Sequence, residues 1–318
     1  MLQVNEKRMK TVPLDTISSV KARPLLFTAS TTSEEAFTTI VGACLGHADA
    51  NRPAVLEGQI EGVHQMRVAF RRLRSGLKIF RPLVPREASA ERVEDIRWLN
   101  GALGPARDWD VFLDEGMPPL FSHFPRKRGL ALFRAKAETI RAAHRQALQQ
   151  TVGDPRYAVL LQAFTDWLDR RTWRDGLSEE RRAKLAEPVL DFATPLLEHT
   201  HRRVVKRGES FAELSSEERH GLRIRIKELR YALDFCASLY PAAAAKSYLS
   251  ALSSLQDCLG VMNDIVVTQR LLDEAGLRTA SAARQVIEGW YGCRLAVHEQ
   301  LFAELWRGFG QCSRPWQD

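Results

Sequence analysis

The chain has 318 residues, a mass of 36.0 kDa and a formal net charge of +7, from 46 Lys and Arg against 39 Asp and Glu. With 45% hydrophobic and 27% charged residues it has the composition of a soluble globular protein, which excludes an intrinsically disordered one. No stretch near the start is long and apolar enough for a membrane span or a secretory signal. The five scattered cysteines form no C-x-x-C pair, which predicts buried free thiols in a reducing cytoplasm and no zinc site.

Apolar residues recur at helical spacing along most of the chain, and no run alternates as a β-strand would, so we predict an all-α fold. Residues 1–30 lack this periodicity and are expected to form an extended or loosely attached arm. The capping box Thr32-x-x-Glu35 predicts the start of the first helix. Further helices are predicted at 63–81, 87–103, 108–116, 128–150, 155–170, 181–207, 216–239, 244–259, 264–275 and 280–308.

The sequence repeats itself at a constant offset of 156 residues, without a gap, through a helix, a turn and a second helix. The aligned pairs include His64 with His220, Arg67 with Arg223, Arg71 with Lys227, Leu103-Gly104 with Leu259-Gly260, and Asp108 with Asp264. This repeat predicts an internal duplication, with a first half at about 31–155 and a second at about 156–318. Two such halves are expected to form two helical bundles packed about a pseudo-twofold axis.

In each half, one predicted helix carries an apolar face and a separate cationic face, which we call its cationic stripe. The first stripe contains His64, Arg67, Arg71, Arg74 and Lys78, and the second contains His220, Arg223, Lys227 and Arg230, with Asp234 at the position of Lys78. Residues 64–81 hold six Lys or Arg and no Asp or Glu. Because like charges at this spacing destabilise a helix, we predict that the stripes bind a polyanion. Solvated or internally paired charge is the alternative.

Two further helical faces are basic but have no partner in the repeat. One contains Arg134, Arg141 and Arg145, and the other contains His199, Arg203 and Lys206. Either face is a polyanion contact or an ordinary solvated surface. We count Arg141, Arg145 and Arg203 among the candidate ligands.

The repeated turns at Gly104-Pro105 and Gly260 are predicted to be helix ends, with glycine as the C-terminal cap. Asp108 and Asp264 then fit the N-caps of the following helices, and a catalytic or metal-binding role is the weaker alternative. The sequence contains no P-loop, dinucleotide fingerprint, nucleophile elbow or H-E-x-x-H motif. We therefore expect no catalytic residue, no metal site and no cofactor.

The chain resembles the CHAD family (conserved histidine α-helical domain) over about residues 31–310. Two pairs of strings carry the resemblance: VHQMRVAFRRLRSGLKIF followed by LGPARDWDVF, and RHGLRIRIKELRYALDF followed by LQDCLGVMNDIVV. The resemblance implies two pseudo-symmetric four-helix bundles in a domain at 31–318, with basic residues of both bundles lining a central cavity or pore. It also implies binding of inorganic polyphosphate and, in some members, attachment to polyphosphate granules. The phosphate contacts would be His64, Arg67, Arg71, Arg74, His220, Arg223, Lys227 and Arg230, with Tyr231 matching the Arg-Tyr pair of the family.

We therefore predict a non-enzymatic, cytoplasmic polyphosphate-binding protein that associates with polyphosphate granules. Granule-associated proteins are further candidate partners, whereas neither nucleic acid as the specific ligand nor a membrane is expected. Many relatives carry a CYTH domain, which is not expected here because only about 30 residues precede the motifs and they lack E-x-E-x-K. The alternatives are a metal-dependent phosphohydrolase acting on polyphosphate or nucleotides, and a generic nucleic-acid or polyanion adaptor.

Overall fold

The computed structural model describes residues 17–317, which contain long helices and no strand beyond a single β-bridge between Thr32 and Pro188. The predicted all-α fold is confirmed. The longer helices are α1 (Ser33–Ala50), α3 (Ile60–Ile79), α4 (Ala90–Val111), α6 (Arg128–Gly153), α7 (Pro155–Asp169), α9 (Val189–Gly208), α10 (Ser216–Cys236), α11 (Ala242–Glu274) and α12 (Ala282–Gly310). Shorter elements are α2 (Arg52–Leu56), η1 (Arg86–Ser89), η2 (Phe112–Gly116), α5 (Pro118–His123), η3 (Thr172–Arg174), α8 (Glu179–Ala186), η4 (Phe211–Glu213) and η5 (Ala237–Leu239).

Four helices of the first half recur in the second half in the same order and at nearly the predicted offset. α1 begins at residue 33 and α9 at 189, while α3 begins at 60 and α10 at 216. α4 and α11 begin at 90 and 242, and α6 and α12 begin at 128 and 282. The helix boundaries thus follow the spacing found in the sequence repeat.

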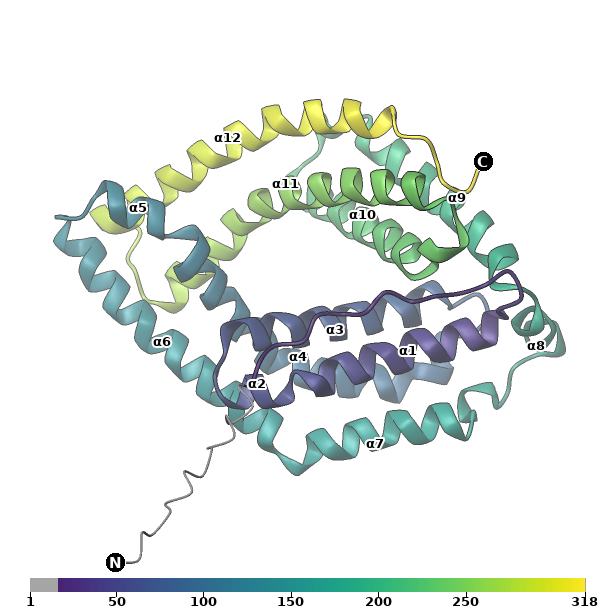
Figure 1. Cartoon of the computed structure of the whole chain (residues 1–318). Coiled ribbons are helices and arrows are strands. Elements are labelled where there is room, and N and C mark those ends of the chain that lie inside the picture. The colour runs from purple at the N-terminus through teal and green to yellow at the C-terminus, as the bar shows by residue number, and fades with distance from the viewer. Residues whose placement is uncertain (1–16, 318) are drawn as a thin grey trace, which may run out of the picture.

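Figure 1 shows α1, α3, α4 and α7 on one side of the molecule and α9, α10, α11 and α12 on the other, with α6 connecting the two at one end. A large core of buried side chains spans both groups and includes Phe37, Phe70, Leu229 and Tyr248. A second core, around Trp109, lies where α4, η2, α5 and α6 meet the far ends of α11 and α12. The two halves are therefore joined both at the crossing of α3 and α10 and at this far end.

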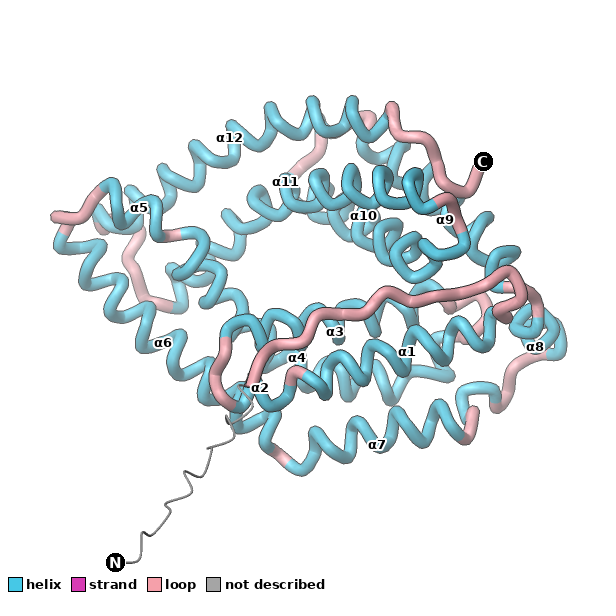
Figure 2. The backbone as a smooth tube through the Cα atoms, viewed as in Figure 1, coloured by secondary structure: helices cyan, strands magenta, loops and turns pink. Residues whose placement is uncertain are grey.

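The N-terminal segment runs without helix or strand along the helices and ties the two halves together (Figure 2). The Val20 amide donates to the Asn51 side chain at the end of α1 (2.9 Å). Phe27 is buried, and its amide donates to Ser238 of η5 in the second half (2.7 Å). Over residues 17–28 the segment is therefore elongated and attached to both halves. Residues 1–16 of the predicted arm lie outside the described part of the chain.

Several predicted boundaries differ from the structure. α4 runs unbroken through Gly104 and Pro105, and α11 runs through Gly260, so the predicted helix ends there are wrong. Pro105 removes one backbone hydrogen bond from α4 and crowds the preceding turn, and burial on the apolar side of the helix offsets this cost. The helix predicted over 181–207 is two helices, because Pro188 disfavours helical backbone in the residue before it.

Other local expectations are met. The Thr32–Glu35 capping box is present at the start of α1, and a second capping box, Ser215–Glu218, starts α10. All five cysteines are free, but Cys293 is exposed, so the prediction of buried thiols is wrong for that residue. Within residues 17–317, no helix combines the length and apolar character that crossing a membrane requires.

Candidate functional site

The cationic stripes lie on α3 and α10, and the opposite faces of these helices anchor them in the core. On α3, Met66, Phe70 and Leu73 are almost fully buried, as are Leu222, Ile226 and Leu229 on α10. Most residues of the two stripes are half-buried, whereas Arg74, Lys78 and His220 are exposed. Packing on one face therefore fixes the direction of the cations on the other.

The two stripes lie close enough for the charge of each to act on the other. Burial is the main cause that lowers the pKa of Lys227 to about 7, and the nearby positive charges of Arg223 and Arg71 lower it further. Burial likewise lowers the pKa of Arg223, with Arg71 and Arg67 of α3 adding to the effect. The structure thus brings Arg67, Arg71, Arg223 and Lys227 from both halves into one concentrated region of positive charge.

Two ion pairs join α3 to α10 beside this region. Arg72 pairs with Asp234, and Lys78 pairs with Glu228. Positions 72 and 228 are equivalent in the sequence repeat, as are 78 and 234, so the two ion pairs join equivalent positions of the two helices. In both pairs the cation is on α3 and the anion on α10. Lys78, predicted as a ligand, is therefore engaged in holding the two helices together.

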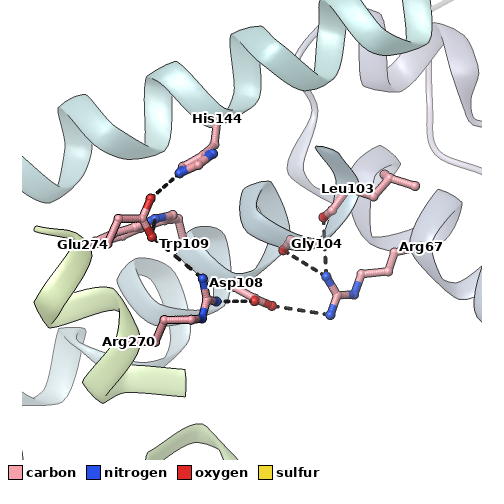
Figure 3. Close-up of polar contacts among 8 residues, drawn as sticks. All are labelled: Arg67, Leu103, Gly104, Asp108, Trp109, His144, Arg270 and Glu274. Carbon is pink, nitrogen blue, oxygen red and sulfur yellow. Dashed lines mark hydrogen bonds and ion pairs between the residues drawn. The ribbon is translucent and has the colours of Figure 1, made fainter. Parts of the chain in front are cut away.

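Arg67 is held against α4 by three acceptors, as Figure 3 shows. Its guanidinium donates to the carbonyls of Gly104 (2.9 Å) and Leu103 (3.4 Å), and Nη2 lies 3.4 Å from Oδ1 of Asp108. Asp108 also accepts a hydrogen bond from Arg270 of α11 (2.6 Å). Asp108 lies inside α4, so the predicted N-cap is wrong; its carboxylate instead connects cations of the two halves.

This connection extends toward α6. Arg270 lies 3.8 Å from Glu274, which also accepts a hydrogen bond from the indole of Trp109 (3.3 Å) and contacts His144. Figure 3 shows these side chains converging from α4, α6 and α11. Arg270 and Glu274 could not be predicted from the sequence, because neither lies in a stripe and only the tertiary structure brings α11 to this place.

Arg223 repeats the arrangement of Arg67 in the second half. A Cβ atom built on Gly260 would lie 3.8 Å from Nη2 of Arg223, and one built on Gly104 would lie 3.5 Å from Nη1 of Arg67. Asp264 stands in for Asp108, and burial raises its pKa to about 6 despite the nearby Arg223. Asp264 lies inside α11, so its predicted role as an N-cap is also wrong. Unlike Arg67, Arg223 has a buried Nε with no hydrogen-bond partner among residues 17–317.

The remaining stripe residues differ in whether their side chains have a hydrogen-bond or ion-pair partner. Within the described residues, no hydrogen bond or ion pair occupies the side chains of His64, Arg71, Arg74 or Lys227. His220 is hydrogen-bonded to Asn263 (2.7 Å), and Arg230 donates to Gln256 (2.9 Å). These last two partners are neutral, so the charge of Arg230 is not compensated by them.

Tyr231 is almost fully buried in the core, and the guanidinium carbon of Arg230 lies 4.7 Å from its ring centroid. Its hydroxyl has no hydrogen-bond partner among residues 17–317. Tyr231 is therefore placed to support Arg230 from beneath.

The other predicted ligands, Arg141, Arg145 and Arg203, lie outside α3 and α10. Arg145 donates to Asp110 through Nε (2.8 Å), and Arg141 donates to Asp114 (2.7 Å), so both brace α6 against α4 and η2. Arg203 is exposed on α9. Burial lowers the pKa of Arg225, and the positive charge of Arg203 lowers it further. Among the described residues, no group of three or more His, Cys, Asp or Glu side chains is arranged to hold a metal ion.

Three comparisons relate the chain to known proteins. The family model for the CHAD domain matches residues 39–273. The crystal structure of the CHAD domain from the plant Ricinus communis is similar, with 32% identity and a TM-score of 0.80, covering 94% of this chain and 98% of that one. PptA from Streptomyces chartreusis is similar in fold, with 13% identity and a TM-score of 0.64, covering 87% of this chain and 100% of that one. A search of curated proteins found no match.

Proposed function

This chain belongs to the CHAD domain family, and we propose that it binds inorganic polyphosphate between the cationic stripes of α3 and α10. The observation that carries the proposal is the excess of positive charge without ion-pair partners where the two stripes meet. Arg71, Arg223 and Lys227 come from both halves, are half-buried and have no carboxylate partner within ion-pair distance among residues 17–317. Clustered cations of this kind destabilise the unliganded protein, and a bound polyanion removes that cost.

A linear phosphate polymer suits this arrangement for geometric reasons. Each stripe follows one helix face, so its cations are spaced along a line and can contact successive phosphates. Arginine donates two parallel hydrogen bonds to phosphate oxygens, and such charge-assisted bonds are stronger than neutral ones. We propose that the region between the stripes is the basic cavity or pore, too narrow for a double helix, and that binding weakens as salt rises.

The test is a triple charge reversal at residues without ion-pair partners: Arg71→Glu, Arg74→Glu and Arg223→Glu. Losing one phosphate contact worth about 1.4 kcal/mol weakens binding tenfold. The affinity of the triple variant for long polyphosphate should therefore fall by at least about 100-fold. The matched control is Arg126→Glu, Arg128→Glu and Arg278→Glu, which makes the same charge change at exposed positions. If the two variants bind equally well, the site assignment is wrong.

We further propose that the protein is a binding module associated with polyphosphate granules rather than an enzyme. Incubation of long polyphosphate with the protein and Mg²⁺ or Mn²⁺ should release no phosphate above the uncatalysed background. Sustained turnover would instead establish the phosphohydrolase alternative. Competition between polyphosphate and DNA at one ionic strength separates a specific site from a generic polyanion surface, because a generic surface would bind both equally per charge.

A further inference from the structure

Lys227 is the one lysine in a cluster of arginines. The positive charges that act on it are those of Arg223 and Arg230 on α10 and of Arg71 and Arg67 on α3. Within residues 17–317, no carboxylate lies within ion-pair distance of its ammonium group; the neighbouring acids Asp264 and Asp257 of α11 act on Arg223 instead. The repeat places Arg71 at the equivalent position in the first half, so the two halves differ here in chemistry but not in charge sign.

This difference matters because the arginines keep their proton throughout the physiological range, whereas a lysine can lose its proton. Burial and the four surrounding guanidinium groups lower the pKa of Lys227 to about 7. The unliganded protein can thus relieve part of its charge repulsion at neutral pH by releasing the Lys227 proton. The other stripe lysine, Lys78, is paired with Glu228.

A phosphate chain between the stripes reverses the local field. Negative oxygens beside Lys227 favour its charged form and offset the repulsion from the arginines. From this arrangement, and resting on the proposed function, we propose that polyphosphate binding takes up a proton at Lys227, so that the protein holds polyphosphate more tightly as the pH falls from 8.5 to 7. Lys227 of the second half then contributes a phosphate contact that depends on pH, and Arg71 of the first half contributes one that does not.

Other titratable groups near the site respond to the same phosphate oxygens and have to be distinguished from Lys227. Burial raises the pKa of Asp264 to about 6, so in the unliganded protein this carboxylate is mostly charged between pH 7 and 8.5. Burial and the charge of Arg107 lower the pKa of His64 in the unliganded protein, and phosphate oxygens beside the ring would raise it again, so the Lys227 variants are needed to separate proton uptake at Lys227 from uptake at His64. His220, at the start of the second stripe, is hydrogen-bonded to Asn263.

Calorimetry tests the proposal directly. Binding of long polyphosphate, whose titrating end groups are few, is measured at pH 7.5 in buffers of different ionisation enthalpy, which yields the number of protons taken up. We expect about 0.8 of a proton per site, because a group with a pKa near 7 is mostly deprotonated at pH 7.5. The dissociation constant should rise about 15-fold between pH 7 and 8.5 for the same reason.

The variant Lys227→Arg should abolish both the proton uptake and the pH slope in this window, while Lys246→Arg, at an exposed position of α11, should keep both. Lys227→Met provides a second test: it should show no proton uptake and bind at pH 7 as the wild type does near pH 8.5 or more weakly. Binding without proton uptake, or uptake that persists in both Lys227 variants, overturns this inference. Absence of binding at every pH overturns the proposed function itself.

Discussion

Arg72 of α3 pairs with Asp234 of α10, and its guanidinium carbon lies 4.9 Å from the ring centroid of the adjacent Phe235. Only 13% of the Arg72 side chain is exposed, against 33% of Asp234, so the cation of this pair is largely shielded from water. Together with the equivalent pair Lys78–Glu228, it fixes how α3 crosses α10 and therefore how the two cationic stripes face each other.

Reversing one member of this pair should destabilise the protein. Arg72→Asp places two carboxylates together in a half-buried site, and we expect a loss of about 2–4 kcal/mol in the free energy of unfolding, measured by urea denaturation. The double variant Arg72→Asp/Asp234→Arg should recover at least half of that loss. Arg97→Asp, which disrupts an exposed pair with Glu94, should cost only about 1 kcal/mol or less. A double variant as unstable as the single one would contradict the pairing.

Arg71 and Lys78 belong to the same stripe but should differ in their effect on binding. Arg71 has no ion-pair partner among the described residues, whereas Lys78 is paired with Glu228. We expect Arg71→Ala to weaken polyphosphate binding about tenfold or more, since one charge-assisted contact of about 1.4 kcal/mol is lost. Lys78→Ala should change it less than about threefold. Fluorescence anisotropy with an end-labelled polyphosphate measures both, and equal losses would show that pairing does not decide which cations bind.

Arg145 should be a structural residue. Its partner Asp110 is fully buried, and one carboxylate oxygen has no hydrogen-bond partner among residues 17–317. Arg145→Met should therefore cost about 3–5 kcal/mol of stability at pH 7.5, because it leaves a buried charge unpaired. Polyphosphate affinity should stay within about twofold of the wild type at temperatures where the variant is folded, in contrast to the prediction from sequence.

The cost of Arg145→Met should also depend on pH. Burial raises the pKa of Asp110, and Arg145 opposes that rise, so its removal raises the pKa further. A carboxyl group with a raised pKa in the folded state keeps its proton where the unfolded chain has lost it, so stability falls as the pH rises through that window. The deficit should be smaller at pH 5 than at pH 7.5, as thermal unfolding at both pH values can measure. A deficit that is independent of pH would exclude Asp110 as its cause.

Gly62 of α3 should be sensitive to substitution because α2 approaches it closely. A Cβ at this position would lie 2.7 Å from Cβ of Ala54 and 2.9 Å from its backbone carbonyl carbon. Since backbone cannot yield as a side chain does, Gly62→Ala should destabilise the protein by about 1–3 kcal/mol. Gly101→Ala is the matched control: it faces open space within α4 and should stabilise by about 0.5–1 kcal/mol. Stabilisation by both substitutions would contradict the close approach.

The sequence predicted the helices and the two stripes because both depend on local periodicity. Met66, Phe70 and Leu73 form one face of α3 whatever lies beyond it, and the cations form another. The role of Gly104 and Asp108 was misjudged for the converse reason. Glycine, proline and aspartate are typical of helix ends, and only the packing of α4 against Arg67 and α11 shows that the helix continues there.

Which cations are free to bind could not be predicted either. Glu228 and Asp234 look like ordinary members of a mixed helix face, and only the crossing of α3 and α10 brings them to Lys78 and Arg72. The same holds for Arg145, which shares a helical face with other arginines in the sequence and pairs with Asp110 of a different helix in the structure. Ion pairs between distant segments leave no mark on local charge patterns.

The N-terminal segment has a mechanical consequence. Its two anchors, the Val20 amide on Asn51 and the Phe27 amide on Ser238, lie in different halves, and only residues 21–26 separate them. A tether this short has little slack, so a movement that spreads the halves apart on this edge has to strain one of these hydrogen bonds. The rates at which these two amides exchange with deuterated solvent therefore report on movements that change the angle between the halves.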